Sequence, residues 1–154
     1  MPGASRGRPK LKSVELNGVS AIVTGGASGI GAASASQLAD RGARVVIADM
    51  QAERGQKLAE EIGGVFVQVD VTKTEQIEDA VNTAMDLGPL RVLVNSAGVG
   101  WAQRTIGKDG EFASAHDLDA YRKVIAINLV GTFDCIRLAA TAMSRLEASG
   151  TGER

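Results

Sequence analysis

A glycine-rich segment near the start of the chain has the residue types and spacing of a phosphate-binding loop. Residues 24–31 have the sequence Thr-Gly-Gly-Ala-Ser-Gly-Ile-Gly and directly follow the apolar run Ala-Ile-Val. Glycines in this pattern allow a tight turn, a close approach of backbone amides to a diphosphate, and packing of the next helix on a sheet. The positive amino-terminal end of that helix attracts phosphates. The pattern predicts a dinucleotide site, with a plain tight turn as the alternative. The predicted contacts are Gly25, Ser28, Gly29 and Gly31.

An acidic residue ends the next apolar run. Asp49 follows Val-Val-Ile-Ala at 45–48, and its spacing from Gly31 suits a carboxylate that accepts both hydroxyl hydrogens of an adenosine ribose. Its neighbour Met50 is expected in the same subsite. A carboxylate repels a 2'-phosphate, and Ser28 stands where the loop would otherwise carry a compensating Arg or Lys, so NAD is favoured over NADP. Capping of a helix at the strand exit is the alternative role for Asp49.

The elements that position these residues alternate from residue 19 onward. Four runs rich in Val and Ile are too short for helices and apolar on both faces, which is typical of strands in a covered parallel sheet. The predicted strands are residues 21–23, 45–48, 65–69 and 92–94, and the predicted helices are 29–41, 52–62, 74–87 and 116–147. Capping patterns at Thr72–Glu75 and Ser114–Asp117 predict two helix starts. Glycines predict three helix ends, at Gly42, Gly63 and Gly88. Right-handed crossovers then give an α/β fold, a doubly wound parallel sheet of the Rossmann type with helices on both faces.

Composition limits the partners. The 154 residues suit one domain, and a net charge of -1 gives no field that would favour nucleic acid or anionic lipid. A single cysteine, Cys135, excludes an internal disulfide framework, and no apolar run approaches the roughly 18 residues of a membrane helix. We therefore expect a soluble cytoplasmic protein without a metal, nucleic acid or membrane partner. Residues 1–12 are expected to be a flexible basic arm, with an organelle-targeting segment as the alternative.

One amide falls on an otherwise apolar helix face, which is formed by Tyr121, Val124, Ile125 and Asn128 at three- and four-residue spacing. Asn128 is expected to hold a water or a backbone carbonyl there, because an unsatisfied amide would be costly. Tyr121 has Ile125 four residues on, so it cannot belong to a Tyr-x-x-x-Lys pair and is predicted to pack. Two further candidates are expected to have no chemical role: His116 and Cys135. The irregular stretch 98–114 is either functional or a plain surface insertion.

Together these motifs resemble the short-chain dehydrogenase/reductase family over about residues 13–154. Residues 24–31 are similar to its Thr-Gly-x-x-x-Gly-x-Gly loop, Asp70-Val71 to its adenine-contacting strand end, and residues 95–98 (Asn-Ser-Ala-Gly) to its Asn-Asn-Ala-Gly segment. The resemblance implies that Asn128 anchors a water in the proton relay of the catalytic tetrad, with a satisfied polar core residue as the alternative. It further implies that Ile30, Ala97 and Gly98 lie along the nicotinamide half of the cofactor site. Asn95 is expected to link neighbouring strands.

A narrower resemblance rests on residues 95–98, the insertion after them, and residues 128–133 (Asn-Leu-Val-Gly-Thr-Phe). These look like type-2 3-hydroxyacyl-CoA dehydrogenases, a group that also oxidises hydroxysteroids as 17β-hydroxysteroid dehydrogenases. The resemblance implies NAD-dependent hydride transfer between a secondary alcohol and a ketone, with acyl-CoA among the candidate substrates.

In the family, the next strand bears the catalytic Ser and the helix after it bears Tyr-x-x-x-Lys, and this sequence reaches neither. Residues 13–154 therefore resemble an amino-terminal, NAD-binding Rossmann portion, which we expect to be inactive alone. The alternative is a truncated nucleotide-binding or interaction protein without catalysis. The resemblance also implies a homo-oligomer through the helix at 116–147 and an exposed sheet edge at 92–94, so the isolated chain is expected to associate.

Overall fold

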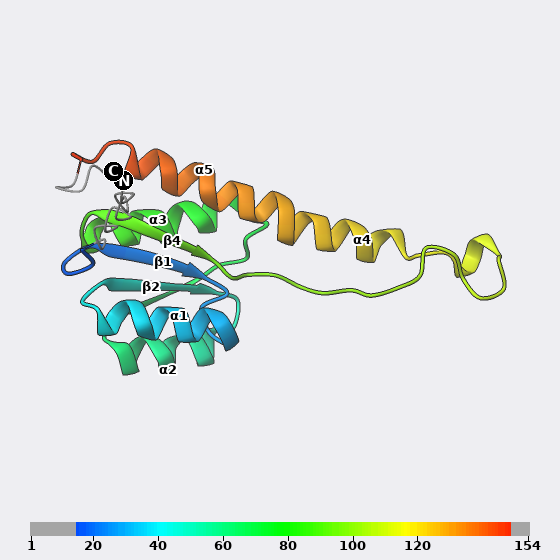
Figure 1. Ribbon diagram of the computed structural model, residues 1–154, viewed down its shortest axis with the longest axis horizontal. Helices are drawn as coiled ribbons and strands as arrows, with labels where there is room; N and C mark the ends of the chain where they lie inside the picture. Colours follow the sequence, from blue (N-terminus) through cyan, green and yellow to red (C-terminus); the bar gives the residue numbers. More distant parts are fainter. Residues whose placement is uncertain (1–14, 149–154) are drawn as a thin grey trace, which may run out of the picture.

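The computed structural model describes residues 15–148. They form a four-stranded, all-parallel sheet with helices on both faces (Figure 1). The strand order is β3-β2-β1-β4, and the strands are β1 (Ser20–Thr24), β2 (Arg44–Asp49), β3 (Val65–Gln68) and β4 (Leu90–Asn95). The predicted α/β doubly wound sheet is confirmed, and β4 lies at one edge of it as expected. The predicted arm at 1–12 lies outside the described residues.

The helices form two layers. They are α1 (Gly29–Asp40), α2 (Ala52–Ile62), α3 (Thr74–Leu87), α4 (Leu118–Ile125) and α5 (Thr132–Met143). Helices α1 and α2 cover one face of the sheet, and α3 and α5 cover the other (Figure 1). Because all four strands are parallel, their carboxyl ends point to the same side of the molecule.

The strands serve two cores at once, because successive side chains point to opposite faces. Ile22 and Val46 pack with α3 and α5, whereas Val23 and Ile47 pack with α1 and α2. All four side chains are buried. This double burial explains why the strands are apolar throughout instead of alternating with polar residues.

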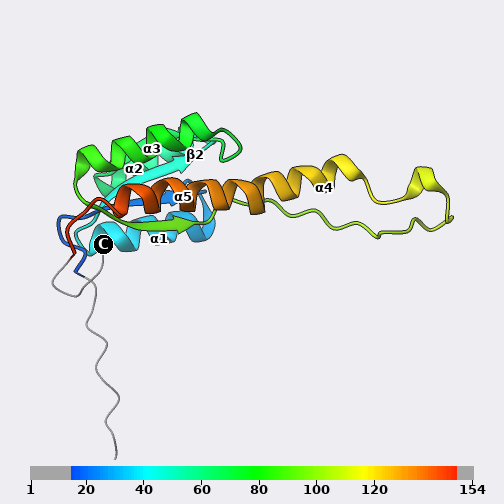
Figure 2. The same ribbon diagram turned by 90° about the horizontal axis from the view of Figure 1, so that it is seen from above.

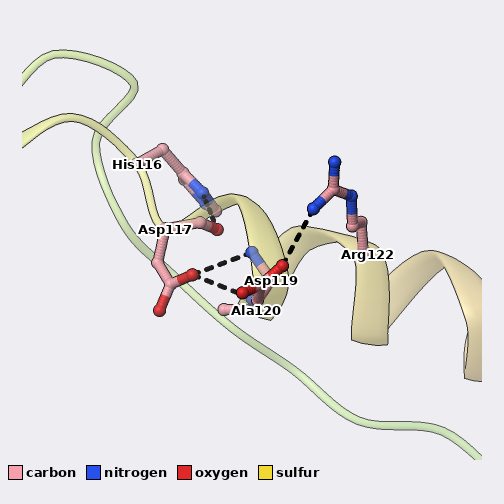
Figure 3. A network of polar contacts seen from close by, with 5 residues as sticks. All are labelled: His116, Asp117, Asp119, Ala120 and Arg122. Atoms are coloured by element: carbon pink, nitrogen blue, oxygen red, sulfur yellow. Dashed lines mark hydrogen bonds and ion pairs between the residues drawn. The ribbon is translucent and has the colours of Figure 1, made fainter. Parts of the chain in front are cut away.

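The starts of α3 and α4 differ from the predicted capping. The Thr72 hydroxyl donates to the Asp70 carboxylate instead of capping α3, and Lys73 at the N-cap position makes no side-chain bond to the helix. At α4 the cap is Asp117, whose Oδ1 accepts from the amides of Asp119 (2.8 Å) and Ala120 (3.1 Å), as Figure 3 shows. A carboxylate one residue before the helix reaches these free amides better than the more distant Ser114 hydroxyl does. The predicted helix ends are confirmed at Gly42, Gly63 and Gly88.

The predicted helix at 116–147 is shorter and not uniform. A π-helical segment, Ala126–Gly131, joins α4 to α5 without a break, so helical structure extends from Leu118 to Met143. By length and composition alone, the stretch Phe112–Met143 is apolar enough to cross a membrane, with an 18-residue window of mean hydropathy 1.5. The expectation that no run approaches this length is therefore corrected. Only 22% of that window is buried: α5 packs on β4 and α3 through Cys135 and Ala139, whereas Leu129, Val130 and Phe133 of the same stretch are exposed.

A long segment leaves the end of β4 and returns as α4. Figures 1 and 2 show it as an arm that extends well beyond the sheet, with α4 running alongside it. Gln103 joins the outgoing and returning segments of the arm: its Nε2 donates to the Ala115 carbonyl (3.4 Å), and its Oε1 accepts from the Asp117 backbone amide (3.0 Å). Its apolar side chains remain exposed, including Phe112 (99%). The predicted irregular stretch at 98–114 is therefore a projecting insertion.

Candidate functional site

An open cleft of about 640 Å³ lies at the carboxyl ends of the strands. Loops leaving β1, β2, β3 and β4 all contribute to it, as the parallel topology requires. Its volume falls in the range of cofactor sites. The lining residues are Gly25, Ser28, Gly29, Ile30, Asp49, Met50, Gln51, Val69, Val71, Ser96, Ala97, Gly98, Val99 and Ile127.

The glycine loop is shaped by backbone contacts that leave no room for side chains. Gly25 has φ +63°, and a Cβ there would lie 2.6 Å from the Ala97 nitrogen. A Cβ on Gly31 would lie 2.1 Å from the Gly25 carbonyl oxygen, because α1 starts directly against the loop. At Gly29 (φ +54°) a Cβ would meet nothing within 4 Å, so this glycine faces open space. The loop thus exposes backbone to the cleft, as a diphosphate-binding turn does.

Asp49 stands at the end of β2 with a side chain that is only 8% exposed. Its Oδ2 accepts a hydrogen bond from the Ala27 amide at 3.0 Å, and its Oδ1 accepts one from the Gln51 amide at 2.9 Å. The second bond is the local turn into α2 that the helix-cap alternative anticipated, although Gln51 holds the N-cap position itself. Each carboxylate oxygen keeps a further lone pair, so the group can still accept from a ribose diol at the cleft.

The exit of β4 is fastened to the exit of β1. The Thr24 hydroxyl oxygen, in a residue 3% exposed, accepts from the amides of Ser96 and Ala97 at 3.3 Å each. This bridge brings Ala97 and Gly98 to the cleft beside the glycine loop, where Ile30 at the start of α1 is 81% exposed. A large apolar side chain held open at this point forms one wall of the cleft.

Asn128 pairs with a backbone segment next to the cleft. Its Oδ1 accepts from the Val99 amide (2.9 Å), and its Nδ2 donates to the Val99 carbonyl (2.8 Å). The expectation that this amide holds a backbone carbonyl is therefore confirmed, while its residue is exposed and not part of the core. Asn128 lies within the π-helical segment, a distortion common at functional sites. The arrangement ties the helix to the strand exit that forms the cleft.

Three predicted contacts do not line the cleft. Gly31 lies beneath the loop and acts through packing. Asn95 pairs with Thr24 in the sheet register, and its side chain is exposed. Asp70 lies beside the cleft, whereas its neighbour Val71 lines it. Hydrogen bonds from the Thr72 amide and hydroxyl hold the pKa of Asp70 below its ordinary value, despite some desolvation.

The cleft also contains residues that were not predicted as contacts, although Ser96 lies in the motif at 95–98 and Val69 in the predicted strand 65–69: Gln51, Val69, Ser96, Val99 and Ile127. Four of them are within four residues of a strand end, so extending each predicted strand by its next few residues would have found them. Ile127 comes from the distant helical segment and is brought in by the pairing of Asn128 with Val99. No local pattern predicts that contact.

The remaining candidates have no chemical role in this arrangement. Cys135 is 1% exposed, and burial raises the pKa of its thiol to about 11. His116 Nδ1 donates to the Asp117 carbonyl (2.9 Å) in the tautomer that carries its proton on that nitrogen. Tyr121 is 53% exposed and packs edge to face against the His116 ring. Within residues 15–148, no cluster of three His, Cys, Asp or Glu side chains is placed to hold a metal ion.

The parallel sheet, the glycine loop after β1 and the acid at the end of β2 define a fold of the Rossmann type, in which dinucleotides bind at the carboxyl ends of the strands. The chain belongs to the short-chain dehydrogenase family, whose model matches residues 20–152. It is 44% identical over 136 residues to a 3-hydroxyacyl-CoA dehydrogenase type-2 of Drosophila melanogaster, covering 86% of this chain and 52% of that protein. The crystal structure of a 3-hydroxyacyl-CoA dehydrogenase type-2 from Mycobacterium avium superposes with a TM-score of 0.83 at 40% identity, over 88% of this chain and 53% of the other.

The relatives are named for different substrates, a 3-hydroxyacyl-CoA in some and borneol in another. A mitochondrial borneol dehydrogenase of Lavandula x intermedia is 39% identical over 129 residues, which are 83% of this chain and 48% of that protein. The chain spans about half the length of the curated relatives it matches. All three of these relatives are named as dehydrogenases, and dehydrogenases of this family typically use a nicotinamide cofactor.

Proposed function

We propose that this chain is the cofactor-binding part of an NAD-dependent dehydrogenase that oxidises a secondary alcohol. The observation that carries the proposal is the cleft at the carboxyl ends of β1, β2 and β4, bounded by a glycine loop on one side and Asp49 on the other. Its dimensions and its exposed backbone fit a dinucleotide. The nicotinamide group, when bound, accepts a hydride from the alcohol carbon.

Residues at different places in the cleft bind different parts of the dinucleotide. Backbone amides of the loop at 25–29 and the first turn of α1 bind the diphosphate. Asp49 accepts from the adenosine ribose, and Val71 packs against the adenine. Ile30 and the backbone at 97–98 flank the nicotinamide half, on the side where β4 ends. Each of these assignments follows the order in which the strand ends meet the cleft.

NAD is preferred over NADP because of the charge at Asp49. A 2'-phosphate near this carboxylate meets a repulsion of about 1 to 4 kcal/mol per unit charge at about 4 Å, depending on the local dielectric. Among the described residues, no Lys or Arg lines the cleft to offset it. That repulsion corresponds to a preference between about fivefold and a thousandfold.

Calorimetry with NADH, NADPH and adenosine diphosphoribose tests this proposal. NADH and adenosine diphosphoribose are expected to bind, and NADPH to bind at least about fivefold more weakly. Quenching of Trp101, the one tryptophan of the chain, gives a second readout, since its side chain is 59% exposed on the segment that follows β4. A folded chain that holds neither NADH nor adenosine diphosphoribose would refute the proposal.

For the whole protein we propose a 3-hydroxyacyl-CoA or a hydroxysteroid as the alcohol. The supporting observation is the likeness to two proteins named 3-hydroxyacyl-CoA dehydrogenase type-2. We propose that in the whole protein Asn128 supports a catalytic Ser and a Tyr-x-x-x-Lys pair, and that the 154-residue chain by itself turns over negligibly. Reading the coding sequence downstream for a Ser and a Tyr-x-x-x-Lys separates this proposal from a nucleotide-binding protein without catalysis.

Location and assembly belong to the same proposal. We place the protein in the cytoplasm, as a homo-oligomer that associates through the α4–α5 helix, whose exposed apolar residues include Leu129, Val130 and Phe133. Imaging of a fluorescent fusion tests the location, and light scattering tests the assembly. A mitochondrial signal would point to the organelle-targeting alternative for residues 1–12.

A further inference from the structure

The carboxylate of Asp49 makes two hydrogen bonds to backbone amides of the chain itself. One oxygen bonds the Ala27 amide, which belongs to the glycine loop, and the other bonds the Gln51 amide at the entry to α2. The side chain is 8% exposed, so these bonds are formed away from bulk water. A residue that served only to contact ribose would have no reason to hold the loop.

The bond to Ala27 spans 22 residues and joins two parts of the cleft that would bind different parts of a dinucleotide. Next to it, the Gly25 amide donates to the Ala48 carbonyl at 2.9 Å, so the loop is attached to β2 at two points. The opposite side of the loop touches the exit of β4, where a Cβ on Gly25 would meet Ala97. The loop is thereby held from both sides, and Asp49 supplies the charged contact.

We propose that Asp49 is a positioning residue for the diphosphate loop as well as the ribose acceptor. By holding the Ala27 amide it sets the loop in its anion-binding conformation before the nucleotide arrives, and it couples the ribose subsite to the diphosphate subsite. The loop is then preorganised, which lowers the cost of ordering it on binding. The part of this inference that concerns a ligand rests on the proposed NAD binding, whereas the part that concerns the loop does not.

Amide hydrogen exchange in the ligand-free chain tests the hold on the loop. In Asp49→Ala both acceptors are lost, and the amides of Ala27 and Gln51 are expected to exchange on the order of tenfold faster or more, as loss of hydrogen bonds to a charged group implies. Asp49→Asn keeps the shape of the side chain and one acceptor oxygen, so these amides are expected to exchange at a rate between those of the unchanged chain and Asp49→Ala. The control is Glu53→Gln, which removes an exposed carboxylate in the first turn of α2 without breaking a bond to the loop.

Strand amides report whether each variant is folded. Protection in β1 and β2 is expected to stay as in the unchanged chain, and if Asp49→Ala fails to fold, the isosteric Asp49→Asn decides. Unchanged exchange at Ala27 in a folded Asp49→Asn and a folded Asp49→Ala would overturn the proposal.

Binding of reduced nicotinamide mononucleotide tests the coupling, because this probe lacks the adenosine and cannot touch a ribose acceptor at β2. If Asp49 acts on the loop, Asp49→Asn weakens this probe as well as NADH, by roughly threefold or more, while Glu53→Gln weakens neither. If Asp49 acts on ribose alone, only NADH binding falls, and the coupling is refuted. A chain that shows the exchange effect but binds no nucleotide refutes the proposed function and leaves the hold on the loop established.

Discussion

Replacing Gly31 by alanine tests how α1 is joined to the phosphate-binding loop. A Cβ at this position would lie 2.1 Å from the Gly25 carbonyl oxygen and 2.8 Å from its carbonyl carbon, whereas ordinary van der Waals contact begins at 3.4 Å. The loop must therefore retreat by more than 1 Å from the helix, and both contacts are with backbone that cannot rotate away. Overpacking of this kind costs about 1 to 3 kcal/mol.

The displaced loop should lose its alignment with the cleft as well as its stability. We expect Gly31→Ala to lower the free energy of unfolding by about 1 to 3 kcal/mol in urea, and to weaken NADH at least about tenfold by calorimetry. Gly100→Ala is the matched control, because nothing lies within 4 Å of a Cβ there. An alanine at 31 that binds NADH and unfolds like the unchanged chain would refute the reasoning that backbone contact shapes the loop.

Three further predictions concern the rest of the chain. Because Cys135 is 1% exposed with a pKa raised to about 11, iodoacetamide at about pH 8 should leave it unlabelled until denaturant is added; rapid labelling of the folded chain would contradict this. Hydrogen bonds from Thr72 lower the pKa of Asp70 in the folded state, so the carboxylate stabilises the fold above its ordinary pKa of 3.8, and this contribution is lost as pH falls through the lower folded value. Asp70→Asn should therefore lower the free energy of unfolding by about 1 kcal/mol or less near neutral pH and by progressively less in acid. Urea titrations that show the same loss of unfolding free energy at neutral and at acid pH would speak against it. Finally, Phe133 is 64% exposed on α5, so Phe133→Glu should reduce self-association in light scattering, whereas Gln56→Glu on the opposite face of the sheet should not.

The sequence was sufficient for the elements whose signals are local. Short Val- and Ile-rich runs with glycines after the helices predicted every strand and the first three helices, because a strand buried on both faces must be apolar throughout. The loop at 24–31 and Asp49 were likewise predicted from spacing. Parallel strands bring their carboxyl ends to one side, so both had to meet at the same cleft.

Local patterns failed where competing groups were available. The hydroxyls of Thr72 and Ser114 were predicted to cap helices, but carboxylates close by in the chain accept their hydrogens instead. The length of the last helix was overestimated, and its π-helical segment has no signature in the hydrophobic periodicity.

What the sequence by itself determined is the order of strands and helices and the identity of the loop and the acid, since these depend on residue type and short-range spacing. Only the tertiary structure decided that Asp49 holds the Ala27 amide, that Asn128 pairs with Val99, and that Asp70 and Asn95 stand outside the cleft. These contacts join residues 22 or more positions apart or depend on where a side chain points. Packing of α1 on the sheet and the docking of the last helix set those distances, and no short stretch of sequence encodes them.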